Sequence, residues 1–352
     1  MVRVGVIGFG LAGQAFHAPV IRGVRGMELA CILERRGNLA REKYPQVRVA
    51  RSLQEFLSDK TMQLCVIATP NDSHFELAKE CLLAGRDVVV DKPFGPTLAE
   101  SQELVRLAAE HGRLITVYQD RRWDGAFHTV QRIIASGALG KIAEYECRFD
   151  RFRLEPKVNA WRENPDQPAA GVLFDLGPHV IDQALILFGE PQRITASAFC
   201  QRETSQVDDA FDVCFEYPTL RAMLRARIIA FAPGPHFLIH GTKGSFVKYG
   251  MDPQEPRLRS GDFPDGFDWG ADWGEDPEEL WGTLSVVGEP VERVQTERGD
   301  YRGFYENVRD AIEKKSPLAV TPEQALRTQR AVVLAHKSSR EKRTVDWNES
   351  PE

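Results

Sequence analysis

The feature that most constrains the fold is a glycine-rich turn, Gly8-Phe9-Gly10-Leu11-Ala12-Gly13, which follows the apolar run Val2–Ile7. Glycines at this spacing between a strand and a helix are typical of a dinucleotide-binding turn. The first permits a sharp bend, the second lets the backbone approach a pyrophosphate, and the third allows close helix–strand packing. The alternative is a glycine-rich connection that binds no ligand. The pattern of the next 110 or so residues favours the dinucleotide interpretation.

Strand and helix signals alternate with short links over residues 1–120, which predicts an α/β Rossmann domain whose parallel sheet is covered on both faces. Capping-box patterns at Ser52–Glu55, Ser73–Glu76 and Thr97–Glu100 predict helix starts. The predicted strands are Val2–Ile7, Leu29–Leu33, Val47–Ala50, Leu64–Thr69, Val88–Val90 and Leu114–Tyr118.

The pattern changes in residues 121–345, where alternating apolar and polar side chains predict a second, α+β domain with a large, mainly antiparallel open sheet. Helices are expected at 126–136, at 301–314 and from Thr321, where Pro322 and Gln324 complete a start signal. Gly261–Gly282 has no clear period and is expected to be a surface loop without a metal site. The predicted strands are 143–151, 194–199, 211–217, 220–229, 237–240 and 245–249.

Composition narrows the class of protein. A chain of 352 residues is long enough for two domains, and its net charge of −6 without a basic face argues against a nucleic-acid binder. No segment reaches the roughly 18 consecutive apolar residues of a membrane helix. The six cysteines form no Cys-x-x-Cys pair, and Val2 leaves no room for a signal peptide, so we expect a cytoplasmic protein in a reducing compartment.

The end of the second predicted strand bears on the choice of cofactor. Glu34 lies about 20 residues after Gly13, where an acidic group binds the adenosine ribose hydroxyls of NAD. Arg35 and Arg36 follow, and a guanidinium there holds the 2′-phosphate of NADP. A carboxylate facing that phosphate is repulsive, so Glu34 and the arginines cannot all point at it. NAD and NADP both stay open, and the two adjacent arginines favour NADP.

Two further segments carry candidate catalytic groups. Lys92, in Asp91-Lys92-Pro93, follows the fifth predicted strand at the edge where open α/β sheets bind ligands; the alternative is a solvated surface charge. Asp175, His179 and Asp182 share one helix face at i, i+4 and i+7, with Pro178 expected in the first turn. The alternative for His179 is a structural histidine on a buried helix.

These segments resemble the Gfo/Idh/MocA family of sugar and polyol dehydrogenases over essentially the whole chain. The resemblance is carried by the glycine turn, the Lys92-Pro93 pair and Asp175-x-x-x-His179, in the family's order and spacing. Phe16-His17-Ala18-Pro19 and the run 174–179 are similar to the branch that contains scyllo-inositol dehydrogenases. Asp91 departs from the family's usual Glu. Gln119-Asp120-Arg121-Arg122 departs from its usual Asn before the arginines, which puts a substrate contact at Asp120 in doubt.

The resemblance implies hydride transfer between a nicotinamide cofactor and a secondary alcohol or ketone of a sugar or cyclic polyol. His179 is then the general acid–base, Lys92 stabilises charge on the reacting oxygen, and Asp175 orients the imidazole or contacts a neighbouring hydroxyl. Expected cofactor contacts also include Thr69, Pro70, Asn71 and His74, and Lys92 itself lies along the cofactor. Expected substrate contacts are Trp161, Arg162 and Asp182; the alternative for Trp161 and Arg162 is a simple surface loop.

Two other classes of protein remain as alternatives. One is an enzyme that retains NAD for transient oxidation during glycoside cleavage. The other is a non-catalytic dinucleotide-binding regulator, which has no need of Lys92, Asp175 and His179 together. The resemblance also implies a homodimer or homotetramer with a small-molecule polyol or sugar substrate, and the sequence predicts no nucleic-acid partner, no membrane contact and no metal.

Overall fold

The computed structural model describes residues 1–156 and 161–351, which form two compact units. The sequence suggested one boundary near residue 120, and in the structure two later segments also belong to the first unit. The first unit comprises Met1–Asp120, Gln254–Trp273 and Asp300–Leu326. The second comprises Arg121–Pro253, Gly274–Gly299 and Arg327–Glu352.

The first unit contains the predicted Rossmann sheet, six parallel strands in the order β3-β2-β1-β4-β5-β6. This order places the ends of β1, β4 and β5 around one edge, where doubly wound sheets bind ligands. The central strands are buried throughout because helices cover both faces. The strands are β1 (Val2–Ile7), β2 (Met27–Leu33), β3 (Arg48–Ala50), β4 (Leu64–Ile67), β5 (Asp87–Val90) and β6 (Ile115–Val117).

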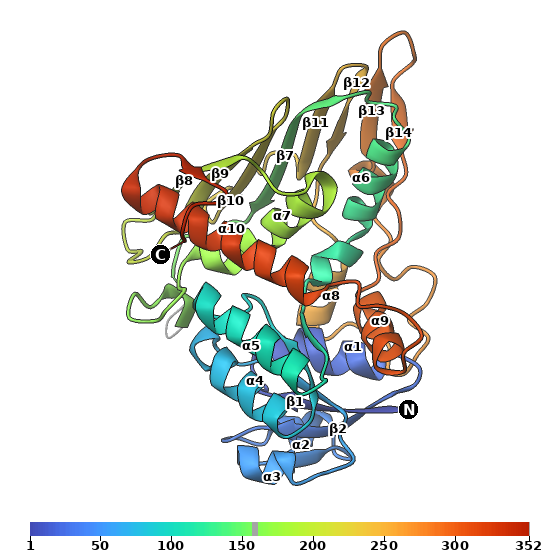
Figure 1. The fold of residues 1–352 in the computed structure, drawn as a ribbon. Helices are drawn as coiled ribbons and strands as arrows, with labels where there is room; N and C mark the ends of the chain where they lie inside the picture. Colours follow the sequence, from blue (N-terminus) through green and yellow to red (C-terminus); the bar gives the residue numbers. More distant parts are fainter. Residues whose placement is uncertain (157–160, 352) are drawn as a thin grey trace. The chain divides into compact units, whose positions relative to one another are not determined.

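Helix starts in this unit follow local capping chemistry in two of three predicted cases. Ser52 accepts a hydrogen bond from the Glu55 amide, and Thr97 forms a complete capping box with Glu100. At Ser73 the predicted helix start is confirmed, because α4 (His74–Leu83) begins directly after it, but the predicted cap hydrogen bond is not formed: the Ser73 hydroxyl donates to Thr69 and Pro70 instead. In Figure 1, α4 and α5 run side by side on the sheet. The helical segments are η1 (Gly13–His17), α1 (Ala18–Arg22), α2 (Leu39–Lys43), α3 (Leu53–Leu57), η2 (Asn71–Ser73), α4 (His74–Leu83), α5 (Leu98–Glu110), α8 (Gln254–Ser260) and α9 (Arg302–Ile312).

The second unit is built on a nine-stranded sheet in the order β14-β13-β12-β11-β7-β10-β9-β8-β15. Every pairing in it is antiparallel except that between β7 and β10, so the predicted mainly antiparallel sheet is confirmed. The strands are β7 (Ile142–Asp150), β8 (Arg193–Phe199), β9 (Ala210–Glu216), β10 (Arg221–Arg227), β11 (Phe237–Gly241), β12 (Gly244–Lys248), β13 (Gly282–Val286), β14 (Glu292–Val294) and β15 (Val345–Asp346).

Three helices cover one face of this sheet and close its core (Figure 1). Tyr145, Cys147 and Phe149 point from β7 into that core, as the alternation predicted. The helical segments are η3 (Asp120–Trp123), α6 (Gly125–Ala135), η4 (Trp161–Glu163), α7 (Val172–Phe188), η5 (Glu278–Leu280) and α10 (Pro322–Glu341), whose first residues belong to the first unit.

The expectation of a surface loop over Gly261–Gly282 holds for most of the segment, which is irregular apart from the short η5 and largely exposed, but two of its tryptophans are buried. Trp269 and Trp273 are 1% and 0% exposed and pack edge to face within the first unit. The Trp269 ring lies against Gly23, where a Cβ would come within 2.8 Å of it. The two indole rings bury enough apolar area to pack this segment against the first unit despite its acidic neighbours. No local periodicity in the sequence indicates this burial.

Candidate functional site

The glycine turn has the shape that a dinucleotide requires. Gly8 has a φ of +98°, and a Cβ there would lie 2.5 Å from the Ala68 carbonyl oxygen. A Cβ on Gly13 would overlap the Gly8 carbonyl oxygen, so both positions require glycine. At Gly10, by contrast, no atom lies within 4 Å of where a Cβ would be. The turn therefore leaves open space beside its backbone at the glycine that the motif assigns to the pyrophosphate.

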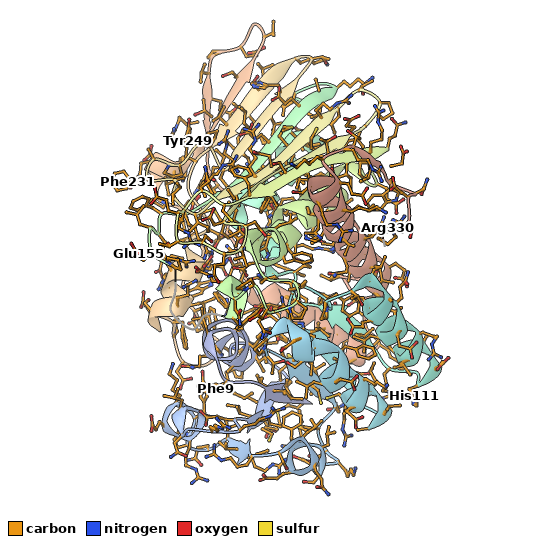
Figure 2. The ribbon with its side chains drawn as sticks, turned by 90° about the vertical axis from the view of Figure 1, so that its left-hand side faces the viewer. Phe9, His111, Glu155, Phe231, Tyr249 and Arg330 are labelled. Carbon is orange, nitrogen blue, oxygen red and sulfur yellow. The ribbon has the colours of Figure 1, made fainter. Side chains whose placement is uncertain are left out.

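Within this turn Phe9 is buried and Leu11 is 45% exposed. Figure 2 shows Phe9 next to the helix that follows the turn. The helix opens as a π turn, η1, in which the Ala18 amide donates to the Gly13 carbonyl. Such turns occur as single insertions in helices, often at functional sites.

Glu34 does not stand open to a ribose, because its carboxylate is already occupied. It is 7% exposed, accepts hydrogen bonds from the Leu39 and Ala40 amides at 3.1 and 3.4 Å, and lies 3.6 Å from Arg51. The carboxylate thus caps α2 from within its own loop. Arg51 also donates to the carbonyls of Glu34 and Gly37, at 2.8 and 2.7 Å.

Arg35 and Arg36 are both exposed on the same loop. The structure therefore separates the acid from the two arginines: the carboxylate turns inward to α2 and Arg51, and the guanidinium groups stay at the surface. Arg51 was missed in the sequence, although its position directly after a predicted strand at this edge was a usable signal.

The ends of β4 and β5 are held together by His74. Its two ring nitrogens lie 3.0 Å from the Pro93 carbonyl oxygen and 2.9 Å from the Thr69 carbonyl oxygen. His74 is fully buried, so it clamps the two loops. Asn71 is 2% exposed in the same turn, Pro70 is exposed, and Lys92 is partly exposed after β5. The Lys92–Pro93 peptide bond is cis.

Helix α7, which carries Asp175 and His179, begins earlier than predicted. It runs from Val172, so Pro178 lies inside the helix rather than in its first turn. The start is set by Asp208, whose backbone carbonyl and carboxylate accept from the Val172 and Leu173 amides at 2.9 and 2.7 Å. This cap comes from a distant part of the chain, so no local sequence pattern predicts it.

Asp208 is also electrostatically unusual. Burial raises the pKa of its carboxyl to about 6, and the charge of Asp209 adds to the rise, although the Leu173 and Val172 amides oppose it. Gly171 precedes the helix with a φ of +92°, and a Cβ there would overlap the Asp208 carboxylate. The start of the site helix thus depends on close packing of this carboxyl.

Asp175 is brought together with two of the three residues predicted to bind substrate, Trp161 and Arg162. The Arg162 Nε lies 2.9 Å from its carboxylate, and the Arg162 guanidinium stacks over the Trp161 ring at 4.4 Å. Asp175 and Arg162 keep 27% and 35% of their side chains exposed, so both remain accessible. Glu163, next in η4, binds Arg153 and Arg202 and anchors this turn.

His179 lies one turn further along α7 and is 7% exposed. Its ring stacks on Phe149 of β7, with centroids 5.8 Å apart and planes 28° apart. The guanidinium groups of Arg121 and Arg151 lie over the same phenyl ring at 5.1 and 4.9 Å. Phe149 therefore fixes the imidazole plane and is lined by positive charge, a role that the β7 alternation alone did not indicate.

Asp182 is placed differently from the other two polar residues of this face. Arg122 binds its two carboxylate oxygens at 2.7 and 2.8 Å, and Thr328 donates to one of them at 3.0 Å. The Asp182 and Arg122 side chains are 3% and 9% exposed. This carboxylate is thus engaged in a buried ion pair, which favours a structural role over the predicted substrate contact.

The predicted residues therefore form separate groups. The glycine turn, the loop of residues 34–36, the β4 end and Lys92 belong to the first unit. Asp175 and His179 belong to the second, together with Trp161 and Arg162. Within residues 1–156 and 161–351 no group of three or more His, Cys, Asp or Glu side chains is arranged to hold a metal ion. In the same described ranges, no helix is long and apolar enough to cross a membrane.

The chain combines a Rossmann sheet and this glycine turn with an α+β unit that carries a histidine and a carboxylate one helical turn apart. This combination defines a class of dinucleotide-binding oxidoreductases. Comparison with known families agrees. Residues 2–119 match the oxidoreductase family described by its NAD-binding Rossmann fold, and residues 131–347 match the C-terminal alpha/beta domain of the same family. The chain belongs to the Gfo/Idh/MocA oxidoreductase family.

Several relatives match over nearly the full length. The uncharacterized oxidoreductase YdgJ of Escherichia coli is 39% identical, with 98% of each chain covered. The scyllo-inositol 2-dehydrogenase (NADP(+)) IolW of Bacillus subtilis is 36% identical, with 98% of this chain and 95% of that protein covered. A solved structure, the putative oxidoreductase yvaA from Bacillus subtilis, matches with a TM-score of 0.92 at 34% identity, covering 98% of each chain.

Proposed function

We propose that this oxidoreductase uses NADP to interconvert a secondary alcohol and a ketone on a sugar or an inositol-like cyclic polyol. The observation that carries the proposal is the arrangement on α7, where the buried His179 lies one turn from Asp175 and Arg162 holds the Asp175 carboxylate. A base beside hydroxyl-binding groups suits a polyol. The 36% identical relative is named an inositol dehydrogenase that uses NADP.

Each residue of the candidate site has a separate role in the proposed reaction. The bound dinucleotide supplies the hydride acceptor or donor. His179 takes the hydroxyl proton during oxidation and returns it during reduction, since imidazole exchanges protons near neutral pH. Lys92 stabilises negative charge developing on the same oxygen. Asp175, with Arg162 and Trp161, orients a neighbouring hydroxyl of the ring.

The glycine turn is suited to hold the pyrophosphate, and the loop after β2 supports NADP as the cofactor. Glu34 is occupied by α2 and Arg51, while Arg35 and Arg36 are exposed without a hydrogen bond or ion pair to the described residues. A 2′-phosphate would meet two guanidinium groups rather than a carboxylate. The predicted cofactor contacts at the end of β4 stay predictions: Thr69, Pro70, Asn71 and His74. His74 would act indirectly, by holding the two loops that it joins.

The reaction is tested by following the absorbance of reduced nicotinamide with a panel of inositols and aldoses. His179→Ala should lower turnover at least ~100-fold if His179 is the general base. His111→Ala is the control, because His111 lies exposed at the end of α5 (Figure 2). Near-normal turnover in His179→Ala would remove this residue from the mechanism.

The alternatives give different outcomes in the same assay. Cleavage of an aryl glycoside with no change in cofactor absorbance would replace the proposal by an NAD-retaining glycosidase. Tight cofactor binding without turnover of any substrate class would favour a dinucleotide-binding regulator.

Cofactor choice is tested by direct titration with NADPH and NADH. Losing a charge-assisted contact to phosphate costs about 1.5–3 kcal/mol. Arg35→Ala or Arg36→Ala should therefore weaken NADPH binding roughly 10-fold or more and leave NADH binding unchanged. Arg41→Ala is the matched control, an exposed arginine on α2. Tighter binding of NADH than of NADPH by the unaltered protein would overturn the choice of NADP.

We also propose a cytoplasmic homodimer or homotetramer. All six cysteines are free thiols, and four of them are buried, which suits a reducing compartment. Light scattering on the purified protein measures the assembly, and a monomeric mass at micromolar concentration would contradict it.

A further inference from the structure

His17 is a buried histidine to which the function proposed above gives no task. It is the last residue of the π turn that follows the glycine turn, and its side chain is 0% exposed. The wider π turn changes which residues face inward, and His17 reaches the interior of the first unit there. A fully buried imidazole needs polar partners, and those of His17 lead to the catalytic lysine.

Two groups lie against the His17 ring nitrogens. Nδ1 is 2.6 Å from the Tyr305 hydroxyl on α9, and Nε2 is 3.8 Å from a carboxylate oxygen of Asp91 at the end of β5. The Tyr118 ring packs beside the imidazole, with centroids 4.4 Å apart. Tyr305, His17 and Asp91 therefore form a buried series of hydroxyl, imidazole and carboxylate drawn from three elements.

Asp91 connects this series to Lys92. One carboxylate oxygen accepts the Lys92 backbone N–H at 2.8 Å, and the other faces His17. Burial alone would raise the pKa of Asp91, but the attraction of His17, Lys92 and His74 outweighs it and lowers the pKa to about 2. Asp91 is therefore ionised at every working pH, and an ionised carboxylate can only accept hydrogen bonds. At 3.8 Å the contact between the His17 Nε2 and this carboxylate is electrostatic rather than a hydrogen bond, and it favours a protonated Nε2 on the side that faces Asp91.

We propose that His17, supported by Tyr305, is a positioning residue for Lys92: it holds the Asp91 carboxylate, which in turn holds the Lys92 backbone at the end of β5. The inference rests on the role proposed for Lys92. His74 anchors the same loop through the Pro93 carbonyl. Removing the His17 contact therefore redirects Lys92 without releasing the whole loop.

Two substitutions of similar size separate positioning from packing. In His17→Gln the side-chain amide nitrogen lies near the place of Nε2, so an N–H donor towards Asp91 is kept. In His17→Asn the amide nitrogen lies near the place of Nδ1, so that donor is lost. Tyr305→Phe removes only the hydroxyl. Each variant is measured for turnover, for the NADPH dissociation constant by fluorescence, and for its thermal midpoint.

The proposal expects turnover to fall roughly 10-fold or more in His17→Asn and to stay within about 3-fold of normal in His17→Gln, because only His17→Gln keeps an N–H dipole facing the buried carboxylate. NADPH binding should change less than about 2-fold in both, and Tyr305→Phe should lie between them. Equal losses in His17→Gln and His17→Asn, or losses that follow the thermal midpoint alone, would show that His17 only packs. If neither variant folds, Tyr305→Phe decides: unchanged turnover would refute the series.

Lys92→Ala distinguishes failure of this inference from failure of the proposed function. If Lys92→Ala abolishes turnover and His17→Asn does not lower it, only the inference fails. If Lys92→Ala turns over normally, the role of Lys92 fails, and the positioning role of His17 fails with it.

Discussion

The ion pair between Asp182 and Arg122 permits a direct test of whether this part of α7 is structural or binds substrate. In Asp182→Ala the Arg122 guanidinium loses both hydrogen bonds to the carboxylate, at 2.7 and 2.8 Å, and stays 91% buried. Thr328 loses its acceptor as well. Breaking a buried pair by removing one partner costs about 3–5 kcal/mol, because the remaining charge is uncompensated.

A loss of this size is measurable by calorimetry or circular dichroism. For a unit of roughly 150–250 residues, 1 kcal/mol shifts the melting temperature by about 2–4 °C, so Asp182→Ala should melt roughly 6–20 °C lower. The double variant Arg122→Met with Asp182→Leu should recover most of this loss, since apolar replacement of a buried pair is often neutral. The exposed pair of Arg106 and Glu103 is the control, and Glu103→Ala should leave the melting temperature nearly unchanged.

The opposite pattern would refute this reasoning. If Asp182→Ala keeps the normal melting temperature and raises the KM for the polyol with little effect on NADPH binding, Asp182 contacts the substrate as its place on the helix face predicts. The engaged carboxylate would then have to leave Arg122 on substrate binding.

Two further predictions concern the caps of the site elements. Asp208 has a folded-state pKa raised above its unfolded value, so its ionisation opposes folding above about pH 6 and ceases to do so as the pH falls towards 4. Asp208→Asn keeps an acceptor for the Leu173 amide but cannot ionise. It should raise the free energy of unfolding, measured by denaturant titration, by on the order of 2–3 kcal/mol at pH 8 and by much less at pH 4. An equal effect at both pH values would contradict this reasoning. Arg51→Ala removes the hydrogen bonds to the Glu34 and Gly37 carbonyls and should weaken NADPH binding about 3- to 10-fold with NADH nearly unchanged, as titration would show. An equal loss for both cofactors would mean that Arg51 only stabilises the fold.

The parallel sheet was predictable because its signals are local and repeated. Each strand is a short apolar run, and the capping box of Thr97 and Glu100 is completed within four residues. The same holds at α10, where Thr321 and Gln324 exchange the predicted hydrogen bonds. In these cases the residues that decide the structure are neighbours in the sequence.

Predictions failed where a side chain has a second local partner available, or where distant segments determine burial. Ser73 has the sequence of a cap, but its hydroxyl bonds to Thr69 and Pro70 in the preceding turn. Trp269 and Trp273 lie in an acidic, glycine-rich stretch that has the composition of a surface loop, and they are buried because the rest of the first unit receives them. Composition reports the average polarity of a segment, whereas burial depends on the surface that each side chain meets.

Helix α7 shows the same contrast between what local spacing predicts and what distant partners determine. Asp175 and Asp182 are two turns apart on one face of α7, so helical periodicity makes them equivalent candidates. In the structure Asp175 keeps 27% of its side chain exposed beside a partly exposed Arg162, whereas Asp182 keeps 3% and is enclosed with Arg122. An exposed ion pair contributes little to stability and can exchange its partner for a substrate hydroxyl, whereas a buried one holds its geometry. The spacing therefore identified the face of the helix. The partners of the two carboxylates come from elsewhere in the chain, and they make Asp175 the residue to test for chemistry and Asp182 the residue to test for stability.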